Sequence, residues 1–157
     1  MTSLPEETVQ DYPRPPALQS VPHTLRIILG GIVAAETTRG YRVLETHHAP
    51  TYYFPPDDVF ADLSPAPGQS FCEWKGLAAY WDVSVADAIA PRAAWSYAKP
   101  TTSFNLITDY LAFYATSMDA CFIGDHKVIP QPGDFYGGWV TDNLRGKIKG
   151  AAGTEHW

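Results

Sequence analysis

A lysine stands at the start of the longest apolar strand pattern in this chain. Residues 71–85 alternate in type, and at a period of two one face carries Lys75 followed by Leu77, Ala79, Trp81, Val83 and Val85. We expect this face to point inward. An ammonium group in an apolar interior costs free energy unless a carboxylate, a ligand or water compensates it. The pattern therefore predicts a binding or catalytic site at Lys75.

Glu45 is the expected partner of Lys75. Tyr41, Val43 and Glu45 share one face of a predicted strand, and Glu45 becomes a partly buried carboxylate if that face points inward. Glu45 would then position Lys75 or act as a general base. Two plainer interpretations are a structural ion pair, and a lysine whose aliphatic stem covers apolar surface while its charge reaches water.

Cys72 and two adjacent histidines are further candidates for chemistry. A nearby ammonium stabilises a thiolate nucleophile, but Cys72 and Lys75 fall on opposite faces of a regular strand, so a small buried hydrophobe is the favoured interpretation. His47 and His48 also point to opposite faces. Either His47 or His48 is a candidate acid or base near Glu45, with local hydrogen bonding as the favoured interpretation. The chain has no Cys-x-x-Cys or His-x-x-x-His spacing, so neither a metal nor a cofactor is predicted.

Aromatic side chains offer walls for a pocket around these groups. Trp95 and Tyr97 share one face of a predicted strand, and Tyr80 lies opposite the more apolar face, where its hydroxyl suits a ligand contact. Most aromatic residues at strand spacing belong to a core, so a structural role is the alternative for several of them. The candidate site therefore has the catalytic residues Glu45, Lys75 and Cys72 and the ligand-binding residues Tyr80, Trp95, Tyr97, Tyr53 and His48.

The composition describes a globular protein of one domain. The 157 residues include 45% hydrophobic and 18% charged side chains, which is enough apolar material for a core. The net charge of −6 argues against a nucleic-acid binder, which carries a basic stripe. No basic N-terminal region leads into an apolar run, and no window reaches the ~20 apolar residues of a membrane span. We therefore expect a soluble cytoplasmic protein with Cys72 and Cys121 as free thiols.

Short apolar runs separated by Gly and Pro predict a mostly β fold. We expect an extended N-terminal arm over residues 1–22, a domain over 23–129, and a Gly- and aromatic-rich C-terminal extension over 130–157 that lies on the surface. The predicted strands cover residues 24–29, 32–36, 41–47, 71–85, 92–97, 118–123 and 127–129. Hairpins are expected at Gly30-Gly31 and residues 124–126, a bulge or bend at Gly76, a short helical turn within 55–63 and a helix over 103–110.

Several short motifs in a fixed order resemble the family catalogued as domain of unknown function 427, which occurs in bacteria, plants and fungi. The resemblance spans roughly residues 24–128, and Phe135-Tyr-Gly-Gly-Trp139 is similar to an extension of some members. The motifs are Val43-Leu-Glu-Thr46, Pro50-Thr-Tyr-Tyr-Phe-Pro55 with Asp58-Val59, Cys72-Glu-Trp-Lys-Gly76 with Tyr80-Trp81, Ala93-Ala-Trp-Ser-Tyr97 with Pro100, and Ala112-Phe-Tyr114.

The resemblance implies a small β-tent-like domain of twisted antiparallel sheets, similar to methionine-R-sulfoxide reductases and the thalidomide-binding domain of cereblon. Those relatives hold zinc with Cys-x-x-Cys pairs, which this chain lacks, so no metal is carried over. The family is also labelled nucleotidyltransferase-like, but the Gly-Ser and spaced acidic pair that such transfer needs are missing. The positions that recur in the family correspond to Glu45, Cys72, Lys75, Tyr80, Trp95 and Tyr97.

Three classes of function fit these observations. The preferred class is a pocket for a small polar or anionic molecule, either a binding site or a cofactor-free acid–base enzyme. The second is an interaction module that grips a peptide in an aromatic cleft. The third is a structural role, in which the rings form core and the termini support a homodimer. Nucleotidyltransferase-like activity is the least favoured.

Overall fold

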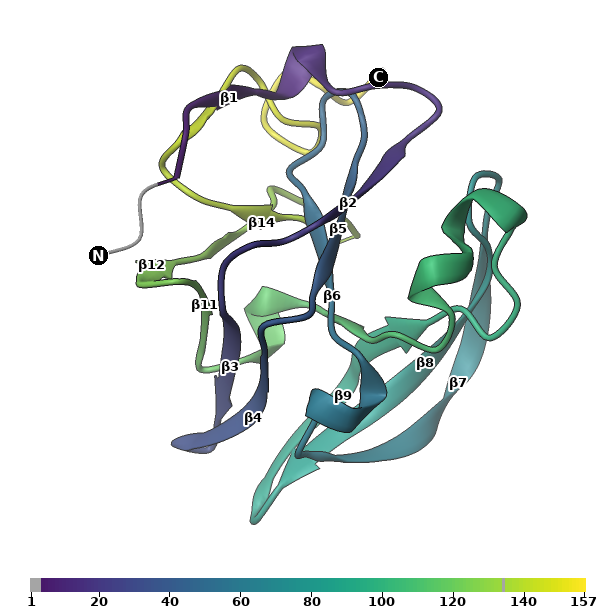
Figure 1. The fold of residues 1–157 in the computed structure, drawn as a ribbon, viewed down its shortest axis with the longest axis vertical. Coiled ribbons are helices and arrows are strands. Elements are labelled where there is room, and N and C mark those ends of the chain that lie inside the picture. Colours follow the sequence, from purple (N-terminus) through teal and green to yellow (C-terminus); the bar gives the residue numbers. More distant parts are fainter. Residues whose placement is uncertain (1–3, 134) are drawn as a thin grey trace.

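The computed structural model describes residues 4–133 and 135–157, and its fold is mostly β (Figure 1). Strands make up 46% of the protein, which confirms the fold class predicted from the sequence. The helical segments among the described residues are short 3-10 turns: η1 (Val9–Asp11), η2 (Pro56–Asp58), η3 (Thr102–Ile107) and η4 (Ala115–Ser117).

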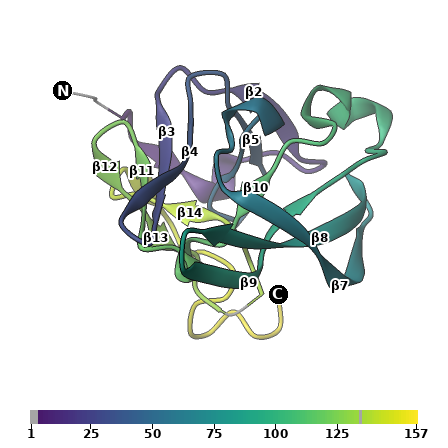
Figure 2. The same cartoon turned by 90° about the horizontal axis from the view of Figure 1, so that it is seen from below.

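Three antiparallel sheets contain most of the strand residues of the described chain (Figures 1 and 2). The first has the order β12–β11–β3–β4, from β3 (Leu25–Leu29), β4 (Ile32–Thr37), β11 (Ala120–Ile123) and β12 (His126–Lys127). The second has the order β10–β9–β8–β7, from β7 (Asp62–Cys72), β8 (Gly76–Val85), β9 (Ala88–Ser96) and β10 (Ala112–Phe113). The third has the order β2–β5–β6, from β2 (Ala17–Ser20), β5 (Tyr41–Leu44) and β6 (Thr51–Tyr53).

Both hairpins predicted for the first sheet are confirmed. Leu29 pairs with Ile32 around Gly30-Gly31, and the two glycines have φ values of 60° and 73°. This is the left-handed backbone that a two-residue hairpin turn requires. β11 and β12 also pair, with Ile123 opposite His126. Local turn chemistry was therefore sufficient to predict this part of the sheet.

Residues 71–85, which are too long for one flat strand, belong to two strands in the structure. The chain reverses at residues 73–75, so that Cys72 of β7 pairs with Gly76 of β8. Gly76 has a φ of +109°, which residues with a Cβ rarely adopt, and glycine at this position permits the three-residue turn. The bend expected at Gly76 is a complete reversal. Lys75 therefore lies in a turn and does not begin a strand face.

The buried face of β8 also differs from the prediction. Ala78 and Tyr80 are buried, whereas Leu77 is 51% exposed. The register between β8 and β9 shifts between Trp81 and Val83, so that Val83 is again buried. A strict alternation of buried and exposed residues cannot describe the whole strand, because a β-bulge exchanges its two faces.

A carboxylate binds the backbone at this bulge. The Arg92 N–H donates to Asp82 Oδ1 over 2.8 Å. Arg92 has a φ of +50°, a left-handed conformation that costs free energy for a residue other than glycine. The hydrogen bond to Asp82 offsets part of that cost and holds the point at which β8 changes its buried face.

Buried side chains form two main groups. The larger group packs the first sheet against the second and includes Leu25, Ile27, Phe54, Phe113 and Trp139. The smaller group, which we call the aromatic cluster, consists of Val43, Tyr53, Ala78, Tyr80, Trp95, Tyr97, Phe104, Ile107 and Ala112. The segment predicted as a helix over 103–110 is the 3-10 turn η3. Phe104 has a non-helical backbone that kinks this segment, and both Phe104 and Ile107 are buried in the cluster.

The terminal segments are part of the fold. β1 (Glu7–Thr8) pairs in parallel with β15 (Leu144–Arg145), and β13 (Ile129–Pro130) pairs with β14 (Trp139–Val140). Trp139 is 1% exposed, and its indole N–H donates to the Phe113 carbonyl over 3.0 Å. Its ring stacks on Tyr52 with the centroids 5.3 Å apart. The tail expected to lie on the surface therefore inserts a large ring into the core.

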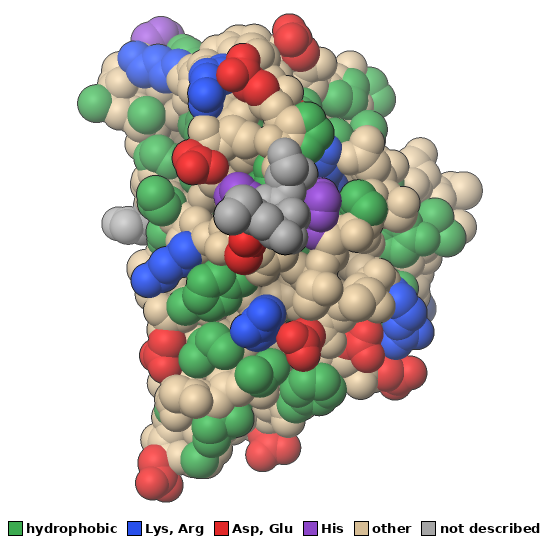
Figure 3. All heavy atoms as spheres, turned by 60° about the vertical axis from the view of Figure 1, so that its left-hand side comes forward, with side chains coloured by type: hydrophobic (Ala, Val, Ile, Leu, Met, Phe, Trp, Pro, Cys, Tyr) green, Lys and Arg blue, Asp and Glu red, His purple; other side chains and the backbone are tan. Residues whose placement is uncertain are grey.

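The surface has mixed charge. Figure 3 shows acidic and basic side chains interspersed with apolar ones over one face of the molecule. None of the helical segments in the described chain has the length and apolar character needed to cross a membrane. Cys72 and Cys121 are free thiols, as predicted, and burial raises the pKa of Cys121 to about 12.

Replacing Trp139 with alanine is expected to lower the free energy of unfolding by about 3–5 kcal/mol, because the change opens a cavity in the core. Urea denaturation followed by circular dichroism measures this loss. Trp157→Ala is the matched control, since Trp157 is 42% exposed, and its loss should stay below about 1 kcal/mol. Equal losses in the two variants would show that the tail does not anchor the core.

Candidate functional site

A cavity of about 240 Å³ lies among the third sheet, the β7–β8 hairpin and the C-terminal segment. We call it the Lys75 cavity. Its lining combines residues from distant parts of the chain, so it exists only in the folded protein. All eight residues singled out from the sequence line it: Glu45, His48, Tyr53, Cys72, Lys75, Tyr80, Trp95 and Tyr97.

Lys75 reaches the cavity from the turn between β7 and β8. Thr101 holds this turn, because its Oγ1 donates to the Trp74 carbonyl over 2.5 Å and its N–H donates to the Lys75 carbonyl over 3.1 Å. Lys75 Nζ lies 5.8 Å from the centroid of the Tyr97 ring, within cation–π range. Within residues 4–133 and 135–157, Lys75 forms no ion pair. The ammonium is therefore available to a ligand.

The predicted ion pair between Lys75 and Glu45 is wrong. Glu45 Oε2 lies 3.7 Å from Arg14 Nη2 and 3.9 Å from His48 Nε2. The strand expected here ends before Glu45, so Glu45 and His48 both lie in the segment that follows β5. The N-terminal segment supplies the cation for this carboxylate, and the β7–β8 turn does not.

His48 is held neutral at the edge of the cavity. Burial, together with the ammonium groups of Lys149 and Lys75, lowers the pKa of His48 to about 4. Gln131 Nε2 lies 3.2 Å from His48 Nδ1. Because an amide N–H can only donate, Nδ1 accepts and the ring proton is assigned to Nε2, the atom nearer Glu45. The site thus presents an uncharged imidazole at neutral pH.

Two buried polar atoms at the cavity have no hydrogen-bond partner among the described residues. They are Tyr53 OH and Gln131 Oε1, on residues that are 0% and 2% exposed. Burial raises the pKa of Tyr53, and polar hydrogens of Trp95 and Tyr97 counter part of this shift without reaching hydrogen-bond geometry. A buried polar atom without a partner costs free energy, and a bound molecule can supply the missing hydrogen bond.

Neutral rings and hydroxyls form most of the remaining wall. Trp95 packs against Tyr114 with the ring centroids 4.6 Å apart, and burial raises the pKa of Tyr114 to about 12. The hydroxyls of Tyr80 and Ser70 share a hydrogen bond of 2.7 Å. Cys72, half-buried, precedes the turn and also lines the cavity. The wall suits an apolar or planar molecular body with a few polar contacts.

Comparison with known families agrees with the motifs found in the sequence. A family profile described as a domain of unknown function (DUF427, NTP_transf_9) matches residues 17–124, more than half of the chain. The chain belongs to this family. The predicted resemblance is confirmed, and the match extends from β2 to just beyond β11. No curated protein matches the chain.

Part of the cavity wall comes from outside the range that matches the DUF427 profile. Gln131, Tyr136 and Gly137 belong to the C-terminal extension. Gly137 lies so close to the Trp95 indole that a Cβ there would overlap the ring. Tyr136 packs edge-to-face on His48 with the centroids 5.3 Å apart. These residues could not be predicted as part of the site, because they lie in a glycine-rich aromatic run without periodicity.

The groups at the cavity suit hydrogen bonding and charge recognition. In the part of the chain that the structure describes, no three His, Cys, Asp or Glu side chains gather to hold a metal ion. Glu45, His48 and Gln131 interact with one another or with the N-terminal arm, whereas Lys75 faces rings and hydroxyls.

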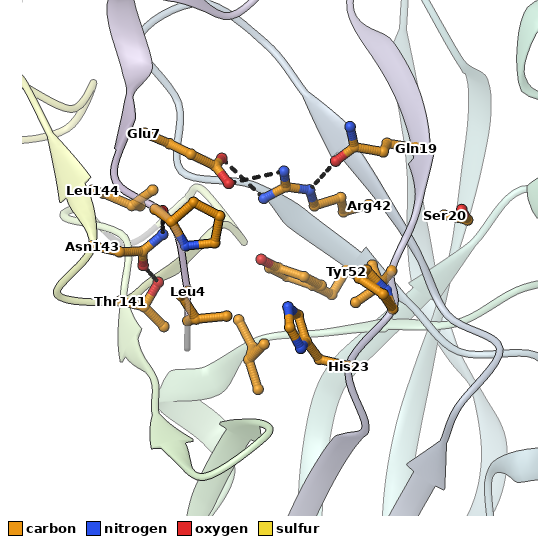
Figure 4. Close-up of a pocket in the computed structure, with 14 residues that line it drawn as sticks. Leu4, Glu7, Gln19, Ser20, His23, Arg42, Tyr52, Thr141, Asn143 and Leu144 are labelled. Carbon is orange, nitrogen blue, oxygen red and sulfur yellow. Dashed lines mark hydrogen bonds and ion pairs between the residues drawn. The ribbon is translucent and has the colours of Figure 1, made fainter. Parts of the chain in front are cut away.

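A larger hollow of about 550 Å³ lies between the N-terminal segment and the third sheet (Figure 4). The Arg42 guanidinium donates two hydrogen bonds of 3.0 Å to Glu7 and one of 2.7 Å to Gln19. Figure 4 shows the side chains of Tyr52 and His23 beside the same space. Because Glu7 already neutralises the cation, this hollow is less suited to a charged ligand than the smaller cavity.

Replacing Tyr53 with phenylalanine is expected to raise the free energy of unfolding of the ligand-free protein by about 1 kcal/mol, because it removes a buried hydroxyl without a partner. Tyr12→Phe is the matched control. The Tyr12 hydroxyl donates to Glu7 over 2.5 Å, so its removal should cost about 1 kcal/mol. Guanidinium denaturation of both variants measures the two changes, and a loss of stability in Tyr53→Phe would contradict the unpartnered hydroxyl.

Acid should destabilise the protein partly through His48. The pKa of His48 falls from 6.5 to about 4 on folding, so the unfolded chain takes up this proton first as the pH drops. The resulting decrease in the free energy of unfolding begins near pH 6.5 and reaches on the order of 3 kcal/mol near pH 4. Below that pH, His48 is protonated in both states and contributes no further decrease. His48→Gln should lack this acid-induced decrease. Urea midpoints at neutral pH and at about pH 4.5 test this, and equal acid losses in both proteins would refute a buried neutral His48.

Proposed function

We propose that the Lys75 cavity binds a small molecule that carries an anionic group. The observation that carries this proposal is an ammonium that has no ion pair among the described residues and lies at a cavity with two buried polar atoms, Tyr53 OH and Gln131 Oε1, that have no partner there either. Lys75 recognises the negative charge. Gln131 Oε1 can only accept, so the ligand also presents an N–H or O–H group, whereas the Tyr53 hydroxyl can donate or accept.

The size of the cavity limits the ligand. A volume of about 240 Å³ equals the space of about eight water molecules at ~30 Å³ each. Pockets for drug-sized ligands are usually larger, at about 300–1,000 Å³. The rings of Tyr97, Trp95 and Tyr114 favour a planar or apolar body between the polar groups. These features support a metabolite-sized ligand.

The geometry supports binding more strongly than acid–base catalysis. A general base works best with a pKa near the working pH, and the pKa of His48 is about 4. The carboxylate of Glu45 already has a counterion in Arg14, whose Nη2 lies 3.7 Å from Glu45 Oε2. Binding therefore uses the groups that lack partners, whereas catalysis would need groups that already interact within the protein.

The other hypotheses have less support. Trp95 is 8% exposed and lies against Gly137, so its ring is not open to a peptide. Nucleotidyl transfer uses metal ions held by spaced acidic side chains. Among the described residues, Glu45 is the one acidic side chain that lines the cavity, so a pair of carboxylates for metal ions is not present there.

Thermal shift with a panel of small carboxylates and phosphate monoesters tests the proposal. A compound at 100 times its Kd should stabilise the protein by about 2.7 kcal/mol. Lys75→Met should remove this shift and leave the stability of the ligand-free protein equal or higher, because an unpaired ammonium is lost from an apolar wall. Lys99→Met is the matched control, since Lys99 is exposed and does not line the cavity.

Two results would contradict a Lys75-dependent binding site. One is a compound shift of the same size in Lys75→Met and in the unchanged protein. The other is the absence of any stabilising compound together with a loss of stability in Lys75→Met, which would give the lysine a structural role.

A further inference from the structure

A further hollow of about 540 Å³ adjoins the Lys75 cavity. Lys75 lines the first space, and Arg92 lines the second. The two spaces share lining residues, and a basic residue lines each of them; we call the two adjoining spaces together the cleft. The residues that line both are Ser70, Tyr80, Tyr114, Phe135 and Tyr136.

The Arg92 guanidinium is held over the shared wall. Its central carbon lies 3.7 Å from the centroid of the Tyr80 ring, a close stacking contact. On β7, a Cβ at Gly68 would stand 3.5 Å from Arg92 Nη2, so the guanidinium also packs beside the Gly68 backbone. The Arg92 backbone has a φ of +50° and is bonded to Asp82. Strained backbone of this kind is often found at functional sites.

Neither cation has a counterion among the described residues. Neither Lys75 nor Arg92 forms an ion pair with any residue in 4–133 or 135–157. The chain nevertheless contains 17 acidic residues against 11 Lys and Arg. Two unpaired cations beside one cleft repel each other, and a doubly anionic molecule converts this repulsion into attraction.

We infer that the cleft binds an elongated dianion, with one anionic group on Lys75 and the other on the Arg92 guanidinium. This inference rests on the proposed function and extends it from one anionic group to two. A guanidinium presents paired N–H donors in one plane, which match the oxygens of a carboxylate or a phosphate. The shared wall of Tyr80 and Tyr114 faces the middle of the ligand, so this part is apolar or planar.

Calorimetric titration with ligands of graded length tests the inference. The probes are straight-chain dicarboxylates from succinate to sebacate, each compared with the monocarboxylate of the same chain length. A second series of terminal diol bisphosphates, with the matching monophosphates, distinguishes phosphate from carboxylate. At the length that spans the cleft, the dianion should bind on the order of tenfold more tightly than its monoanion.

Substitutions at Arg92 test whether its guanidinium causes the tighter binding of the dianion. Arg92→Gln should abolish the difference between dianion and monoanion while the affinity for the monoanion persists. Arg92→Gly removes the same guanidinium and relieves the positive φ, so an equal loss in this variant is not caused by unfolding. Arg145→Gln is the control, because Arg145 lines neither space, and it should keep the full gain.

The outcomes separate this inference from the proposed function. Equal affinities of dianions and monoanions at every length, or a gain that survives Arg92→Gln, overturn the inference. If monoanions still bind and lose affinity in Lys75→Gln, the proposed function stands alone. Binding that is unchanged in Lys75→Gln, or no binding by either series, overturns both.

Discussion

The hydrogen bond from the Arg92 N–H to Asp82 Oδ1 holds the bulge on which the candidate site depends. At this bulge β8 exchanges its two faces, so that Tyr80 and Val83 are both buried although three positions separate them. Tyr80, before the bulge, belongs to the aromatic cluster and lines the cavity, whereas Val83, after it, belongs to the larger core group. Arg92, whose N–H binds Asp82 at the bulge, places its guanidinium over the Tyr80 ring. Residues at this one bulge therefore contribute to both the buried core and the surface cleft.

The turn before Gly76 has an equally direct consequence. It places Lys75 on a loop held by Thr101, where the ammonium meets aromatic rings in place of a carboxylate. Glu45, which sequence reasoning assigned to Lys75, is occupied by Arg14. Among the described residues, this leaves a cation without an ion pair and a buried Tyr53 hydroxyl without a partner, and both cost stability. We interpret this cost in stability as the physical basis for ligand binding.

Segments outside the compact sheets complete the cavity. Arg14 precedes the range that matches the DUF427 profile, and Gln131 and Gly137 follow it. Arg14 neutralises Glu45, Gln131 orients the His48 ring, and Gly137 permits the tail to cover Trp95. The family domain therefore supplies the rings and the lysine, whereas the terminal segments set the charge and close the wall.

Local patterns were sufficient for a definite part of this structure. The Gly30-Gly31 hairpin, the mostly β class and the family could be predicted from the sequence, because turn residues, Gly/Pro spacing and short motifs act through near neighbours in the chain. The eight proposed site residues were also chosen from residue type and spacing, and the structure brings them to one cavity. Their use by a ligand stays a prediction.

Tertiary structure decided the direction and partner of each side chain. The face of Tyr80 depends on a bulge, the position of Lys75 on a turn, and the pairing of Glu45 on an arm about thirty residues away in the chain. Trp139 is held in the core because its indole N–H donates to the Phe113 carbonyl and its ring stacks on Tyr52. Such choices depend on which distant surfaces meet and which buried polar groups they satisfy, and no periodicity within one segment contains that information.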